Sequence, residues 1–211
     1  MSFIGKGYIA TALSLTSIAI AAPALAHHPF ESNTPTNFIQ GFLSGLGHPI
    51  IGLDHFAFVV AVGLLAALFK KRSIVIPLAF ALATALGAVI HLQSIDLPIA
   101  EVIIALSVTA IGAALALPTR FNLGLLTAFG SIAGIFHGWA YGEAIFGAEM
   151  TPLGAYLLGF VGIQLVVSAI AFYLGRLTVT NFEQNTSLAL RFAGCVILGM
   201  GITFLSGALF S

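Results

Sequence analysis

The stretch GLGHPIIGLDHFAFVVAVGLLAALF, from Gly45 to Phe69, decides how the whole chain is interpreted. Its second half is as apolar as a membrane-spanning helix, yet its first half carries His48, Asp54 and His55. Polar and ionisable side chains are costly to place in a bilayer, and they usually mark a functional site there. The stretch therefore predicts a membrane protein with a polar site at the start of a span.

The rest of the chain has the same membrane character. Of its 211 residues, 59% are apolar and only 7% are charged, whereas a soluble domain carries about 25% charged residues. The formal net charge is zero, which excludes a basic surface for nucleic acid. The single cysteine, Cys195, excludes an internal disulfide and a cysteine-rich metal site.

Residues 1–26 have the pattern of a cleavable signal peptide. Lys6 provides a positive charge, Tyr8–Ile20 is a short apolar run, and Ala24-Leu25-Ala26 fits the small-residue cleavage rule. An uncleaved first helix is the alternative. We expect residues 27–211 to form a single transmembrane domain whose mature N-terminus is extracytoplasmic.

Hydropathy predicts an all-α membrane protein with six transmembrane helices after the signal peptide. A short half-helix over 38–47, ending at Pro49, is expected before the first span, because a crossing helix needs about 20 residues. The six spans are expected at 50–69, 74–92, 99–117, 121–141, 153–175 and 189–210.

The charged residues indicate how the spans are oriented. With six spans, all the mature basic residues fall on one side, which the positive-inside rule makes cytoplasmic. The mature N-terminus then lies outside, as a cleaved signal peptide requires. All the histidines, and all the acidic residues except Glu183, fall on the outer side or in the outer part of a span. We therefore expect a multi-pass protein of the cytoplasmic (inner) membrane with a polar site near its outer surface.

The first span supplies the strongest candidate metal site. On a continuous helix His48 and His55 share a face two turns apart, and Asp54 lies about 100° from His55. Pro49 fits the first turn of that helix, where its missing N–H is harmless. Imidazole and carboxylate groups together suit nickel, cobalt or zinc, although the carboxylate could instead orient the histidine. A capped helix start is the alternative without a metal.

The fourth span delivers a histidine and an acid to the same depth. His137 and Tyr141 are four residues apart and share a helix face, and Glu143 follows them. The same span repeats a glycine every fourth residue, which favours close packing between membrane helices: Gly134, Gly138 and Gly142.

The other polar residues are less informative. Glu101, in the first turn of the third span, could complete the site or simply face the positive end of the helix dipole. His91 ends the second span, where a lone histidine is more typical of an interface residue; with His27 and His28 it is a candidate for capturing cations. Gln164, in the middle of the fifth span, is expected to form hydrogen bonds between helices.

The chain resembles the HupE/UreJ family of nickel/cobalt permeases in three blocks: HPIIGLDHFAFVVAVG, AEVIIALSVTAIG and FHGWAYGEA. The resemblance implies secondary uptake of Ni²⁺ or Co²⁺ that serves hydrogenase, urease or cobalamin synthesis. Family members commonly carry a second histidine where this chain has Tyr141, and a phenol with a pKa of about 10 is a poor ligand. The resemblance implies a metal site made of the family's signature residues: His48, Asp54, His55, Glu101, His137 and Glu143.

We therefore expect a secondary transporter rather than an enzyme. Its cargo is expected to be nickel or cobalt, with zinc as a further candidate, and we expect no permanently bound cofactor. The expected partners are the cation and the lipid bilayer, and the sequence leaves open whether the chain forms a homo-oligomer. Two alternatives remain: a membrane-embedded hydrolase that uses a metal-bound water, and a non-transporting accessory protein that delivers metal to hydrogenase or urease.

Overall fold

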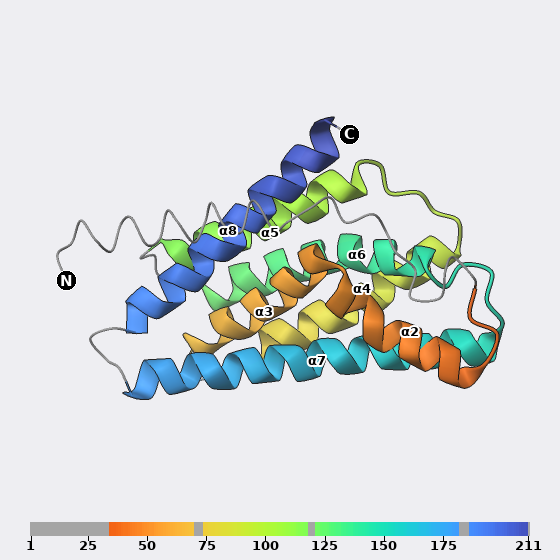
Figure 1. Ribbon diagram of the computed structural model, residues 1–211, viewed down its shortest axis with the longest axis horizontal. Helices are drawn as coiled ribbons and strands as arrows, with labels where there is room; N and C mark the ends of the chain where they lie inside the picture. The colour runs from red at the N-terminus through yellow and green to blue at the C-terminus, as the bar shows by residue number, and fades with distance from the viewer. Residues whose placement is uncertain (1–33, 70–73, 118–120, 182–185, 211) are drawn as a thin grey trace.

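The computed structural model describes residues 34–69, 74–117, 121–181 and 186–210. In these ranges the chain forms seven α-helices, shown in Figure 1, and the predicted all-α class is confirmed. The predicted signal peptide, with His27 and His28, lies outside the described residues. The helices are α2 (Phe38–Ile51), α3 (Leu53–Ala67), α4 (Val75–Leu92), α5 (Ala100–Ala116), α6 (Leu123–Glu143), α7 (Met150–Asn181) and α8 (Thr186–Phe210).

Four of these helices, α4, α6, α7 and α8, are long and apolar enough to cross a membrane. Helices α2 and α3 pass the same test as one span, although the chain bends by 79° between them. Helix α5 is also apolar but has only 17 residues. The chain is therefore a multi-pass membrane protein with four or five candidate spans, while the sixth span and the orientation stay predictions.

The bend between α2 and α3 corrects the expected start of the first span. Helix α2 continues through Pro49 to Ile51, so that Pro49 lies in its last turn rather than in the first turn of the span. Gly52 then adopts an extended conformation and α3 begins at Leu53. A Cβ atom at Gly52 would lie 2.7 Å from the His55 ring. The helix is therefore interrupted at Gly52, where the absence of a Cβ atom leaves room for the His55 ring against the backbone.

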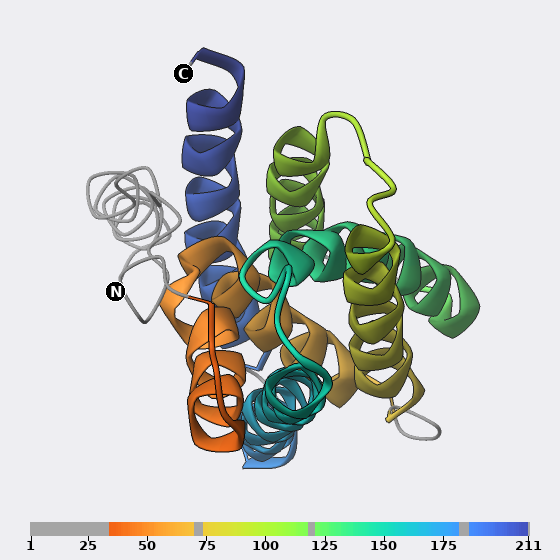
Figure 2. The ribbon, with the colours of Figure 1, turned by 90° about the vertical axis from the view of Figure 1, so that its right-hand side faces the viewer.

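Three pairs of helices around α3 pack closely at glycines: α2 with α7, α4 with α6, and α5 with α8. Helix α3 packs against α7 in the same way at Gly63. Figure 2 shows the three pairs arranged around α3. A Cβ atom at Gly138 of α6 would overlap the backbone of Thr84 on α4, and one at Gly142 would lie 2.6 Å from His91 Cβ. Close approach of this kind is how helices associate in lipid, which supplies little hydrophobic driving force between them. The predicted packing role of the α6 glycines is confirmed.

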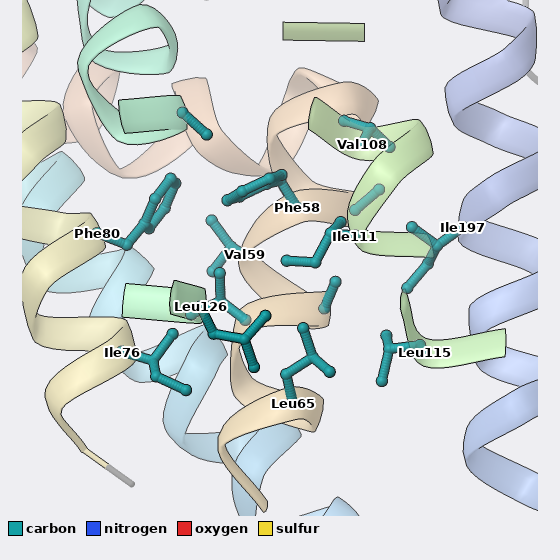
Figure 3. Packing of buried hydrophobic residues seen from close by; sticks show 14 of the residues in the cluster. Phe58, Val59, Leu65, Ile76, Phe80, Val108, Ile111, Leu115, Leu126 and Ile197 are labelled. Atoms are coloured by element: carbon teal, nitrogen blue, oxygen red, sulfur yellow. The ribbon is translucent and has the colours of Figure 1, made fainter. Parts of the chain in front are cut away.

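Helix α3 lies in the middle of the bundle and meets two kinds of core. Most of its length packs into an apolar cluster that includes Phe58, Val59 and Leu65, shown in Figure 3. The ring of His55, in its first turn, instead contacts Tyr141, which belongs to a second, smaller core cluster with Tyr156. The polar end of the bundle is therefore the end where α2 bends into α3.

Two arginines bond to helix carbonyls at the other end of α3 and α5. Arg191 Nε donates to the carbonyl of Ala116, the last residue of α5, at 2.9 Å. Arg176 donates to the carbonyl of Ala67, the last residue of α3, at 3.3 Å. Arginine is favourable at helix C-termini because it satisfies the last carbonyls. Ala67 lies about 18 Å further along α3 than His55, so these arginines are well separated from the polar end.

Candidate functional site

Three histidines and two tyrosines from four helices meet where α2 bends into α3. His48 lies on α2, His55 on α3, His137 and Tyr141 on α6, and Tyr156 on α7. We call these five side chains the His–Tyr cluster. His137, Tyr141 and Tyr156 are fully buried, and His55 is only 6% exposed. The structure thus brings together the three histidines that the sequence placed in one site.

The rings of His48 and His55 both pack against Tyr141. Its ring centroid lies 5.1 Å from that of His48 and 4.5 Å from that of His55. The His48 and His55 centroids are 5.9 Å apart, and those of His55 and His137 are 4.9 Å apart. Although His48 and His55 lie on different helices, the bend at Gly52 keeps their rings together.

One hydrogen-bond chain fixes the protons of His137 and His55. Ser107 on α5 donates its hydroxyl to the carbonyl of Ile104 at 2.7 Å. A hydroxyl has a single proton, so Ser107 accepts from the Nε2–H of His137 at 2.9 Å. Nδ1 of neutral His137 is then an acceptor and receives the Nδ1–H of His55 at 2.7 Å. Neutral His55 therefore carries its lone pair on Nε2.

A second chain fixes the proton of His48 in the same way. Tyr156 donates to the carbonyl of Tyr141, in the last turn of α6, at 2.7 Å. Its oxygen must therefore accept from the Nδ1–H of His48, at 3.2 Å, and neutral His48 carries its lone pair on Nε2. Metal-binding histidines usually donate their other ring N–H to a nearby acceptor. His48 and His55 both have that arrangement. Both ring nitrogens of His137 are bonded to protein groups, to His55 and to Ser107.

Asp54 is the acid closest to the cluster. Its Oδ1 lies 4.0 Å from Nε2 of His55 and accepts the backbone N–H of His55 at 2.8 Å. Glu101 and Glu143 are exposed, and no hydrogen bond or ion pair within the described ranges joins them to the cluster. Of the predicted acids, the structure therefore places only Asp54 beside the histidines.

His91 lies apart from the cluster. Its ring is half-buried and packs against Trp139 and Phe146, with centroid separations of 4.5 and 5.7 Å. Across the described residues, no three His, Cys, Asp or Glu side chains are placed closely enough to hold a metal ion by themselves. The residues predicted to bind metal therefore do not form one compact ligand set here.

Sequence reasoning missed Ser107 and Tyr156, which fix the histidine protons. A serine in a membrane helix usually bonds only to its own backbone, and the sequence around a tyrosine gives no sign of which group its hydroxyl meets. The one available signal was that each is a polar side chain within a predicted membrane span. The expectation for Gln164 is confirmed, since its amide donates to Thr84 on α4 at 3.1 Å.

Comparison with known proteins places the chain among its relatives. The family model described as HupE / UreJ protein matches residues 14–204. This chain belongs to the HupE/UreJ family. It is also similar to Protein HupE of Rhizobium leguminosarum bv. viciae, with 28% identity over 196 residues that cover 92% of this chain and 97% of that protein. No solved structure matches. The resemblance drawn from the three sequence blocks is therefore confirmed.

Proposed function

We propose that this chain is a secondary transporter that carries Ni²⁺ or Co²⁺ across the cytoplasmic membrane through the His–Tyr cluster. Membership of the HupE/UreJ family and several apolar helices support the proposal. The observation that carries it is the pair of hydrogen-bond chains, which give His48 and His55 the same tautomer, protonated on Nδ1, with buried His55 beside half-buried Asp54. In a membrane interior, two such imidazoles and a carboxylate are suited to receiving a cation.

The residues of the proposed site have different roles. His48 and His55 supply nitrogen ligands, and Asp54 supplies a negative charge and an oxygen ligand, a combination that suits nickel, cobalt or zinc. His137 orients His55 through the bond between their Nδ1 atoms and does not itself bind the ion. A transporter must release its cargo, so a small ligand set completed by water is favourable.

The acids outside the cluster act before binding in this proposal. Glu101 and Glu143 are exposed at an end of α5 and an end of α6, where they attract cations to the polar end of the bundle. With that end facing outward, a negative-inside membrane potential favours entry by about 2.3 kcal/mol per charge for each 100 mV. No nucleotide is needed to drive uptake.

Uptake of radiolabelled Ni²⁺ and Co²⁺ by cells expressing the chain tests the proposal. His55→Ala removes a proposed ligand and should abolish uptake at equal membrane expression. Tyr173→Phe is the control, because Tyr173 is exposed on α7 and has no part in the proposed site, and it should leave uptake unchanged. If the unaltered chain takes up neither ion, the transporter proposal is wrong, and the hydrolase and accessory alternatives become the better explanations.

A further inference from the structure

Tyr141 carries a buried hydroxyl that is not satisfied by the described part of the protein. The residue is 0% exposed, and no hydrogen-bond partner for its hydroxyl is found among the described residues. The other tyrosine of the cluster, Tyr156, has two partners. Buried polar groups are almost always bonded, and each exception requires an explanation.

The position of Tyr141 suggests what that explanation is. Its ring contacts the rings of His48 and His55, the two residues proposed above as nitrogen ligands. A phenol keeps its proton near neutral pH, since its pKa is about 10, so Tyr141 is a poor direct ligand. A neutral hydroxyl is, however, a good partner for a water molecule, because it can both donate and accept.

The small number of protein ligands also indicates that a bound cation keeps water molecules. No three metal-binding side chains within the described ranges stand close enough to hold an ion alone, so a cation among His48, His55 and Asp54 would keep water ligands. Such a water is a strong hydrogen-bond donor, because the cation polarises its O–H bonds. The hydroxyl of Tyr141 is the group of the cluster that still needs a bond.

We propose that Tyr141 accepts a hydrogen bond from a water molecule carried by the transported cation, and that this bond selects a partly hydrated divalent ion. The inference rests on the proposed transport function and deepens it. Six-coordinate Ni²⁺ and Co²⁺ can keep waters beside two imidazoles and a carboxylate. Zn²⁺ in proteins is usually four-coordinate, so it has fewer waters to offer Tyr141. The hydroxyl thus favours nickel and cobalt over zinc.

Binding of Ni²⁺ and Zn²⁺ to the purified full chain in detergent tests this role with Tyr141→Phe. The variant keeps the ring contacts and loses only the hydroxyl. The Kd for Ni²⁺ should rise about tenfold, as expected for one hydrogen bond to a charged group, while the Kd for Zn²⁺ changes much less. Tyr173→Phe is the matched control, because Tyr173 is exposed on α7, and it should change neither value.

Two further readouts separate this role from a structural one. In the absence of metal, Tyr141→Phe should unfold at the same or a higher temperature, because the hydroxyl it removes has no partner. The d–d absorption of bound Co²⁺, weak for six-coordinate and strong for four-coordinate ions, should be weak in the unaltered chain and stronger in the variant.

The outcomes distinguish the two proposals. If the unaltered chain binds neither Ni²⁺ nor Co²⁺, the proposed function fails. If it binds them and Tyr141→Phe keeps the same ratio of Kd values for Ni²⁺ and Zn²⁺, the role of Tyr141 is overturned while the transporter stands. A variant that unfolds at a lower temperature without metal, or does not fold, also overturns it, since the hydroxyl would then have a structural partner.

Discussion

The two ends of α3 meet different surroundings, although a single helix runs through both. Around Val59 and Leu65 the neighbours are apolar, and these residues are held by shape and close contact (Figure 3). Around His55 the neighbours are rings and hydroxyls, and each proton in the hydrogen-bond chain has one position. We infer that the apolar end of α3 contributes mainly to stability, whereas the end at His55 fixes the positions of the histidine ring nitrogens and their protons.

Replacing Leu65 by alanine should give the largest loss of stability. It tests whether the apolar end of α3 contributes to stability without contributing to metal binding. Leu65 is 1% exposed, and truncating a buried leucine costs about 2–5 kcal/mol through lost contacts and a cavity. The unfolding temperature in detergent should fall strongly, while the Kd for Ni²⁺ of the molecules that remain folded should not change. A weaker Kd in the folded fraction would contradict the separation of the two ends.

Gly138→Ala should disturb both ends together, because it forces apart the helices that carry them. A Cβ atom there would overlap the backbone of Thr84, and overpacking typically costs about 1–3 kcal/mol. Since His137 is the adjacent residue, Ni²⁺ binding should weaken as well as stability.

Gly154→Ala on α7 is the control for this packing effect. In the described part of the chain, no atom lies within 4 Å of a Cβ atom built at Gly154, and alanine favours a helix over glycine by up to about 1 kcal/mol. Thermal unfolding should therefore show a stable or stabilised protein. Equal losses in the two glycine variants would mean that backbone flexibility, rather than the contact between α4 and α6, is responsible.

The fold was largely predictable from the sequence because hydropathy is a local property. The span expected at 74–92 is α4, Val75–Leu92, and that expected at 99–117 is α5, Ala100–Ala116. The bend at Gly52 was not predictable, because it depends on the His55 ring lying against that backbone. A continuous helix was the simpler expectation for a run with Pro49 near its start.

The site was predictable in its histidines and not in its hydrogen bonds. His48, His55 and His137 fall at one predicted depth of the membrane, so their clustering could be inferred from the spacing and the placement of the predicted spans. Ser107 and Tyr156 act through single atoms, and which carbonyl or ring nitrogen each one meets depends on how four helices pack. Glu101 and Glu143 were candidate site residues beside Asp54 in the sequence, yet both are exposed.

Ser107→Ala should have a moderate effect on stability and a larger one on metal binding. It leaves the Nε2–H of buried His137 without its acceptor, at a cost of about 1–3 kcal/mol. His137 and His55 are then free to exchange proton positions, so the Kd for Ni²⁺ should rise about 10- to 100-fold, as for other groups that orient a ligand.

The control for Ser107→Ala is Thr127→Val on α6. The Thr127 hydroxyl bonds to the Leu123 carbonyl of its own helix, so its loss should change the Kd for Ni²⁺ little. Ser107→Ala with an unchanged Kd would mean that the proton of His137 does not determine which nitrogen His55 presents to the ion.

Tyr156→Phe should give a smaller change in the Kd for Ni²⁺ than Ser107→Ala, and it tests which of His48 and His55 contributes more to metal binding. The bond from His48 to Tyr156 is 3.2 Å, longer than those in the Ser107 chain, so we expect a Kd for Ni²⁺ only about tenfold higher. The variant also loses the bond to the Tyr141 carbonyl, so the unfolding free energy should fall by about 1–3 kcal/mol. Tyr173→Phe, an exposed tyrosine on the same helix, should change neither. A Kd that rises more for Tyr156→Phe than for Ser107→Ala would reverse this order and make His48, rather than His55, the principal ligand, because each substitution releases the proton of only one of the two.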